Sequence, residues 1–374
     1  MSSRHGALAA RTISKSIGLP SGPMRARIRA RLFGLLGLRA SALCYGRAPG
    51  TNAMVFFPRE LCRRPLWATL LLLGVVPCTR AAAQELEPRA YAPSPVGANF
   101  FIVGYSYQSG EVLFDPSLPF SDVNAYINGV STGYGHTFPL FGRFASAAVA
   151  VPYAFGSING NVGEDYTRIT RSGLGDLRVR FVVNLLGGPA LTMKEFRARK
   201  PETTLGFSLV VSAPTGQYSP EKLINIGTNR WAFKPEFGLS HPTGHWTLEA
   251  SAGVWLFMDN THTYPGENVR SQDPLFTFQA HAGYTFRPQL WLALDATFYG
   301  GGRTATNGVP GDTRQSNTRV GATFSLPVAR GHTIKLLAAT GVSARVGSRF
   351  NTYGIAYQFL WLDWPWTRRG QGPS

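Results

Sequence analysis

Residues 275–286 read LFTFQAHAGYTF, a stretch in which every second residue is apolar. Successive side chains of a β-strand point to opposite faces, so this alternation predicts a strand with one apolar and one polar face. The apolar face carries Phe276, Phe278, Ala280, Ala282, Tyr284 and Phe286, and the other face carries Thr277, Gln279, His281, Gly283 and Thr285.

The same period of two recurs along the chain between clusters of Gly, Pro, Asn and Asp. Beyond the first 84 residues no run approaches the roughly 18 consecutive apolar residues of a membrane-spanning helix, which excludes a helical membrane protein. We predict twelve strands, at residues 98–108, 124–138, 143–155, 173–185, 203–213, 228–240, 244–257, 274–286, 289–299, 316–327, 332–345 and 351–362.

The lengths of the connections distinguish a membrane barrel from a soluble β-sandwich, whose strands would show the same alternation. The connections after predicted strands 2, 6, 8 and 10 span only a few residues, whereas those after strands 1, 3, 5, 7 and 9 are long, at 109–123, 156–172, 214–227, 258–273 and 300–315. Long external loops, short periplasmic turns and an even strand number are typical of outer-membrane barrels. The sequence therefore predicts an all-β fold, a transmembrane antiparallel up-and-down β-barrel of about 12 strands with its polar face toward the lumen.

Two connections depart from this rule. Residues 186–202 form a long, basic turn, which we interpret as an amphipathic periplasmic piece, and the loop after strand 11 is short.

The first 83 residues are predicted to be a leader and residues 84–374 the barrel. Basic residues at 59–64 precede an apolar run at 66–76 and three alanines at 81–83, which is the order of a secretory signal peptide over about 54–83. We interpret residues 1–53 as a mis-assigned start, with Met24 and Met54 as later candidates; a long leader is the alternative. An exported chain of this class is expected in the outer membrane of a Gram-negative bacterium, delivered by the export and barrel-assembly machinery.

The formal net charge of +17 resembles that of a nucleic-acid-binding protein, but its distribution does not. Residues 1–84 hold 13 of the 37 Lys and Arg and one of the 20 Asp and Glu, which leaves 24 basic against 19 acidic residues in the body. The body has no long Lys/Arg run, so nucleic acid is excluded as a partner. All three cysteines also lie in the leader.

Charged and polar residues on the predicted inward faces are candidates for lining the lumen. They are Asp176, Arg178, Arg180, Arg230, Lys234, Glu236, Glu249, His281, Asp295, Arg319 and Lys335. Asp176 with Arg178, and Glu236 with Lys234, stand two residues apart on one face, where they can pair along the wall. Such pairs indicate either a charged constriction that guides solutes or wall charges that satisfy each other. The basic excess, to which Arg345 contributes, predicts a mild preference for anionic solutes.

Several motifs occur together in an order that resembles a known family. They are RAYAPSPVGAN (89–99), GLGDLRVR (173–180), APTGQY (213–218) and NIGTNRWAFKPEFG (225–238). The chain is similar to the outer-membrane transporters of the MetA pathway of phenol degradation over essentially its whole mature length. The resemblance implies a barrel associated with passage of aromatic and other hydrophobic compounds. One departure is the chain end, where Trp361, Trp364 and Trp366 are followed by eight further residues, 367–374, instead of a terminal aromatic.

The sequence offers little for an enzyme. Ser240 and His241 are adjacent, so their side chains point apart in a strand, and no phosphate loop or metal-ligand spacing is present. We therefore expect no catalysis, no cofactor and no metal. The expected function is passive passage of small, aromatic or hydrophobic compounds, with outer-membrane lipid as the other partner. The alternative is a non-conducting structural or binding barrel that uses its external loops, because the sequence leaves open whether the lumen is plugged.

Overall fold

The structure of the chain, a computed structural model, describes residues 43–47, 54–58, 88–114 and 120–363. The chain forms two compact units, Met1–Thr69 and Leu70–Ser374. In the first unit, β1 (Leu43–Arg47) and β2 (Met54–Pro58) pair as a two-stranded antiparallel sheet. Most of the predicted signal peptide, residues 59–83, lies outside the described residues, so the leader and its cleavage stay a prediction.

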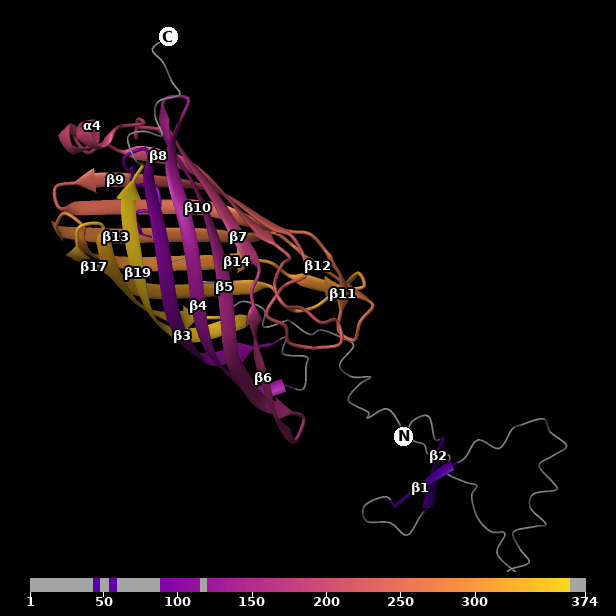
Figure 1. The fold of residues 1–374 in the computed structure, drawn as a ribbon. Coiled ribbons are helices and arrows are strands. Elements are labelled where there is room, and N and C mark those ends of the chain that lie inside the picture. The colour runs from indigo at the N-terminus through magenta and orange to yellow at the C-terminus, as the bar shows by residue number, and fades with distance from the viewer. Residues whose placement is uncertain (1–42, 48–53, 59–87, 115–119, 364–374) are drawn as a thin grey trace, which may run out of the picture. The chain divides into compact units, whose positions relative to one another are not determined.

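The second unit is a β-barrel built from a single large antiparallel sheet (Figure 1). Its strands are β3 (Ala98–Leu113), β4 (Phe120–Leu140), β5 (Arg143–Val162), β6 (Asp165–Leu174), β7 (Leu177–Leu186), β8 (Thr204–Ala213), β9 (Ala232–Thr243), β10 (Trp246–Phe257), β13 (Leu275–Arg287), β14 (Leu290–Gly301), β17 (Gln315–Ala329), β18 (His332–Ser343) and β19 (Gly347–Leu362).

The sheet closes into a ring of twelve positions. The last strand β19 pairs with the first barrel strand β3 from Ala98↔Leu362 onward, and β4 pairs with both β3 and β5. Strands β6 and β7 share one position, because both pair with β5 and are separated by Gly175 and Asp176. The predicted twelve-stranded antiparallel barrel is therefore confirmed. Closure leaves no free edge along the wall, as a hydrocarbon surrounding requires.

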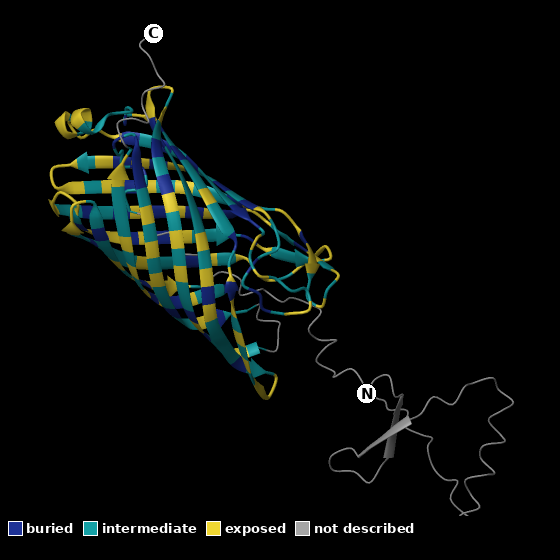
Figure 2. Ribbon diagram, in the orientation of Figure 1, coloured by how far each residue is buried: buried dark blue, intermediate teal, exposed yellow. Residues whose placement is uncertain are grey.

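The burial pattern is that of a membrane barrel and not of a soluble sandwich. Along β14, Leu294 is 62% exposed, whereas its neighbours Ala293 and Asp295 are buried. Figure 2 shows the resulting chequered pattern over the wall. A soluble sheet would bury the apolar face and expose the charged one, because charged groups lose hydration in an apolar core. The reverse arrangement here places large apolar side chains against lipid and polar ones inside.

The predicted strand positions hold, but several predicted loops are wrong. Residues 156–172 were expected to be an external loop, yet β5 continues to Val162 and β6 begins at Asp165 after a two-residue turn. Residues 258–273 and 300–315 contain short strands, β11 (Asn260–Thr263), β12 (Asn268–Gln272), β15 (Thr304–Thr306) and β16 (Val309–Pro310), which form a separate four-stranded sheet. Beyond the bilayer both faces of a strand meet water, so the apolar alternation ends while the backbone ladder continues.

The long basic connection between β7 and β8 contains the helix α4 (Met193–Ala198). Thr192 caps it: the Thr192 hydroxyl accepts from the Glu195 N–H, and the Glu195 carboxylate accepts from the Thr192 N–H. This capping box starts the helix despite its short length, and the bond from the Thr192 backbone lowers the pKa of the exposed Glu195 carboxyl. The loop between β18 and β19 is short, as predicted.

Among the residues that the structure describes, no helix has the length and apolar character needed to cross a membrane.

Candidate functional site

A belt of charged side chains lies on the inward face of strands β7 and β9, which flank β8 in the sheet. The ammonium Nζ of Lys234 lies 2.9 Å from the Glu236 carboxylate, and an Arg180 guanidinium nitrogen lies 3.9 Å from it. The Gln279 amide from β13 also donates to Glu236, at 3.2 Å. Glu236 is only 2% exposed, so the carboxylate is held by donors from three strands instead of water. The expected pairing of Lys234 with Glu236 along the wall is present.

A second polar line continues around the inner wall from β10 to β17. Glu249 stands directly opposite His281 in the ladder, and His281 stands opposite Asp295. The His281 ring nitrogen Nδ1 lies 2.7 Å from the Asp295 carboxylate, and the Thr323 hydroxyl donates to the other carboxylate oxygen at 2.8 Å. All four side chains are buried. The belt thus consists of buried polar side chains, with hydrogen-bonded groups centred on Glu236 and on Asp295.

The segment that precedes β3, residues 88–97, runs inside the ring of barrel strands. We call this segment the N-terminal plug. The Arg89 N–H donates to the Glu249 carboxylate, and the Arg89 guanidinium donates to the Thr285 hydroxyl and lies 4.7 Å from the centre of the Trp291 ring. Arg89 therefore connects the plug to three strands of the inner wall. Sequence reasoning placed Arg89 in a family motif and missed this role.

Tyr91 anchors the plug on the adjoining strands β8 and β9. Its hydroxyl donates to Glu236 at 2.7 Å and lies 3.0 Å from the Ser208 hydroxyl, and its ring is buried. The ring covers Gly206 and Gly238, which are directly paired in the ladder, and a Cβ on Gly238 would lie 1.9 Å from a ring carbon. A glycine in a strand interior often marks such a close approach. Gly206 and Gly238, two glycines at inward strand positions, were the signal in the sequence that could have indicated a segment packed against this part of the wall.

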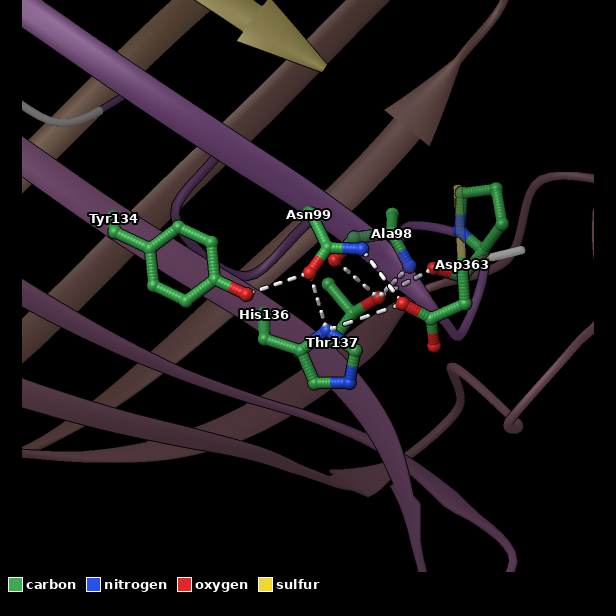
Figure 3. A network of polar contacts seen from close by, with 7 residues as sticks. Ala98, Asn99, Tyr134, His136, Thr137 and Asp363 are labelled. Atoms are coloured by element: carbon green, nitrogen blue, oxygen red, sulfur yellow. Dashed lines mark hydrogen bonds and ion pairs between the residues drawn. The ribbon is translucent and has the colours of Figure 1, made fainter. Parts of the chain in front are cut away.

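The plug leaves the lumen through a fixed turn at the base of β3. The Thr137 hydroxyl from β4 donates to the Pro95 carbonyl at 2.7 Å and accepts from the Ala98 N–H at 2.8 Å. On the outer side, the Asn99 amide donates to Asp363 and its carbonyl accepts from the Tyr134 hydroxyl, with His136 3.0 Å away (Figure 3). These contacts join β3, β4 and the end of β19, so the end of the plug next to β3 is fixed to the wall.

The other end of the lumen is narrowed by the connection between β8 and β9, residues 214–231. The Asp176 carboxylate accepts from the Gly216 N–H at 2.9 Å, and from the N–H and hydroxyl of Thr228 at 2.9 and 2.6 Å. Ile226 packs against a buried cluster of Val112, Ala125, Ile127, Ala154 and Phe350 on the inner wall. The sequence indicated that Asp176 can pair with Arg178. In the structure Asp176 lies between β6 and β7, outside the regular ladder, and its carboxylate binds Gly216 and Thr228 of this connection instead.

This arrangement predicts that Asp176→Ala loosens residues 214–231. Three hydrogen bonds to a carboxylate are each worth about 1.5–3 kcal/mol, so amide hydrogen exchange in this connection should accelerate at least about tenfold. Asp273→Ala is the matched control, because Asp273 pairs only at 3.7 Å with Arg303 and both are exposed. Equal exchange in the two variants would mean that Asp176 does not hold the connection.

Tyr218 and Asn260 tie the same connection to the small external sheet. The Asn260 amide donates to the Tyr218 hydroxyl at 2.9 Å and to the Thr228 carbonyl at 3.1 Å, and the Tyr218 hydroxyl donates to the His262 carbonyl. Burial raises the pKa of the Tyr218 hydroxyl, so it stays protonated as a donor.

Arg178, Arg319 and Lys335 lie on inward positions of the wall, whereas Arg230 belongs to the connection that precedes β9. Arg230 donates to Gln272 and lies 4.6 Å from the Phe257 ring centre, and Arg319 donates to the Phe350 carbonyl at 3.3 Å. Arg178 and Lys335 are half-buried. Arg345 is different: it lies beyond β18 in an exposed pair with Asp312 at 2.6 Å, so its expected place in the lumen is wrong.

The residues that resembled catalytic material do not form a site. Ser240 is buried on the inner face, whereas His241 is exposed and its ring contacts the Thr203 hydroxyl at 2.7 Å. Within the described parts of the chain, no group of three or more His, Cys, Asp or Glu is placed to hold a metal ion.

Comparisons with known proteins agree with this architecture. The family model described as "Putative MetA-pathway of phenol degradation" matches residues 115–359. The COG4313 outer membrane channel from Pseudomonas putida F1 is 20% identical, with a TM-score of 0.63 over 74% of this chain and 100% of that one. The transport unit of the autotransporter AIDA-I from Escherichia coli is 10% identical, with a TM-score of 0.44 over 79% and 97%. No curated protein matches. The chain is an outer-membrane β-barrel and belongs to this MetA-pathway family.

Proposed function

We propose that the protein is an outer-membrane channel through which small aromatic or hydrophobic compounds diffuse passively. The observation that carries this proposal is the N-terminal plug. It is an occupant of the lumen held by a few main-chain and side-chain hydrogen bonds of Arg89 and Tyr91, and it takes no part in the strand ladder of the wall. Such a segment can leave the lumen without unfolding the barrel. The family described for the MetA pathway of phenol degradation and the similarity to an outer membrane channel of P. putida support the same function.

The chemistry of the inner wall supports aromatic solutes. Trp255, Leu275 and Ala232 form a buried cluster on it, with Phe257 and Tyr299 packed alongside. Rings on the wall can exchange contacts with an aromatic solute, while the charged belt orients its polar end. In this proposal the solute enters between the external loops and passes the belt. It then leaves where the plug has moved aside, without an energy source or a cofactor.

The test is the conductance of the purified, refolded protein in planar bilayers. We expect discrete steps, small in the wild type because the plug occupies a barrel that is already narrow at twelve strands. Silence in a folded, heat-modifiable barrel whose plug has been displaced would contradict the channel. That result would favour a binding barrel whose contact surface is the external sheet of β11, β12, β15 and β16.

We further predict a mild anion preference. Six of the proposed lumen residues are Lys or Arg and four are Asp or Glu. The pairs Lys234–Glu236 and His281–Asp295 leave more positive than negative side chains on the lumen wall. Reversal potentials under a salt gradient should show roughly twofold selectivity for anions, and Lys335→Gln should lower it. A cation preference would contradict this assignment of the lumen residues.

A further inference from the structure

The two ends of the barrel carry opposite charge. At the end of the short turns, the exposed basic side chains are Arg143, Lys194, Arg197, Lys200, Arg287 and Arg330, and the acidic ones in the described residues are Glu195, Glu202 and Asp363. The opposite end has nine exposed acidic side chains (Glu111, Asp122, Glu164, Asp165, Glu221, Asp259, Glu267, Asp273 and Asp312) against six exposed basic ones. We call the six basic residues at the short turns the periplasmic rim, because short turns face the periplasm in such barrels.

The acidic groups at the rim are already engaged. Glu195 accepts from Thr192 in the capping box, Glu202 accepts from the Gly188 N–H at 3.0 Å, and Asp363 accepts from Asn99 at 2.7 Å. These donors are neutral, so the three carboxylates keep their charge, but the six exposed basic side chains outnumber them and the end of the short turns keeps a net positive charge.

Phe141, at the same end of the barrel as the periplasmic rim, is a highly exposed apolar residue. It occupies the β4–β5 turn with 96% of its surface exposed. Its φ is 49° and that of Gly142 is 73°, and Leu140 pairs with Arg143, so this is a two-residue hairpin turn with both central residues left-handed. Asn, Asp and Gly are preferred in such turns, and a bulky residue there is strained. A strained, exposed aromatic side chain indicates a constraint from outside the fold.

The Phe141 turn is joined to the chain that leads to α4. The Ala190 N–H donates to the Gly142 carbonyl at 3.1 Å, and the Phe144 N–H donates to the Gly188 carbonyl at 3.1 Å. Leu186, at the end of β7 just before this segment, is 61% exposed. Exposed apolar side chains beside exposed basic ones are the composition of a surface that rests in a lipid headgroup layer. Figure 1 shows α4 beyond the strand ends at this end of the barrel.

We propose that the periplasmic rim, together with Phe141 and Leu186, binds anionic phospholipid headgroups of the periplasmic leaflet. The lipid phosphates pair with the basic side chains, and Phe141 inserts among the acyl chains next to them. This surface lies outside the lumen, so the proposal does not depend on what the barrel conducts.

The test compares spin-labelled phosphatidylglycerol with spin-labelled phosphatidylcholine in vesicles that contain the full-length refolded protein. The relative association constant, obtained from the fraction of spin-labelled lipid whose motion the protein restricts, should favour phosphatidylglycerol about fivefold. This ratio corresponds to about 1 kcal/mol, the attraction of one basic side chain to an anionic lipid surface. The triple variant Lys194→Gln, Arg197→Gln, Lys200→Gln should reduce this preference severalfold, as should high salt. Phe141→Asn suits the turn better, so the barrel should stay folded while the restricted fraction of both lipids falls, because both carry the acyl chains among which Phe141 inserts.

The matched control is the triple variant Arg168→Gln, Lys222→Gln, Arg314→Gln, which removes three exposed charges from the opposite end. It should keep the preference. Equal restriction of the two lipids by the wild type would overturn the proposal and favour an acidic periplasmic protein as the occupant of the rim. A preference that disappears in the control triple but persists in the rim triple would also overturn it.

Discussion

Replacing Gly238 by alanine is expected to raise the fraction of time that the barrel conducts at least about tenfold. The new Cβ would lie 1.9 Å from a ring carbon of Tyr91, so the ring must leave the paired glycines Gly206 and Gly238. The Tyr91 hydroxyl then loses its bond to the Glu236 carboxylate, and a hydrogen bond to a charged group is worth about 1.5–3 kcal/mol. That loss moves the plug toward its undocked state.

Single-channel recording of the refolded variant measures this effect, and Gly283→Ala is its matched control. Gly283 also faces inward in a strand, but a Cβ there would meet its nearest atoms at an ordinary 3.7 Å. Both variants add one methyl group to the wall, so only the contact with Tyr91 differs. If Gly238→Ala conducts no more than Gly283→Ala, then docking of Tyr91 does not limit passage, and the connection at 214–231 becomes the candidate constriction.

The sequence predicted the wall of this barrel well because the wall obeys a local rule. In a spanning strand, one face meets lipid and the other the lumen, so the residues themselves record the alternation. Lys234 and Glu236 illustrate this: their spacing alone predicted a shared face and a pair, and the structure has both. Where strands rise above the bilayer, as β5 and β6 do at 156–172, the two faces no longer differ in polarity. There the rule gives no signal, and a hairpin was predicted to be a loop.

The contents of the lumen followed no such rule. Arg89 and Tyr91 contact residues more than a hundred positions away, and no periodicity in residues 88–97 indicates a docked segment. The partners of Asp176 were missed for a related reason: Gly216 and Thr228 belong to a distant connection that the ladder brings to the β6–β7 break. Which lumen charges face an open path and which hold a plug in place depends on such long-range contacts.

Replacing Glu236 by leucine is expected to lower the free energy of unfolding by about 3–5 kcal/mol. Lys234 is 3% exposed, and the substitution removes the carboxylate that its ammonium contacts at 2.9 Å while leaving its charge buried. Urea titration of the refolded barrel, followed by the heat-dependent shift in gel mobility, measures the loss. Arg345→Ala is the control, because its pair with Asp312 is exposed and should be worth less than about 1 kcal/mol.

The double variant Lys234→Met, Glu236→Leu separates the two causes of this loss. Replacing a whole buried ion pair by apolar side chains is often neutral, so the double variant should recover at least about half of the stability. It cannot recover the bond from Tyr91, so its plug should still dock weakly and its conductance should exceed that of the wild type. If Glu236→Leu instead costs no more than Arg345→Ala, water reaches the belt. The charged side chains of the wall would then be hydrated as in an open pore, and the plug would not shield them from water.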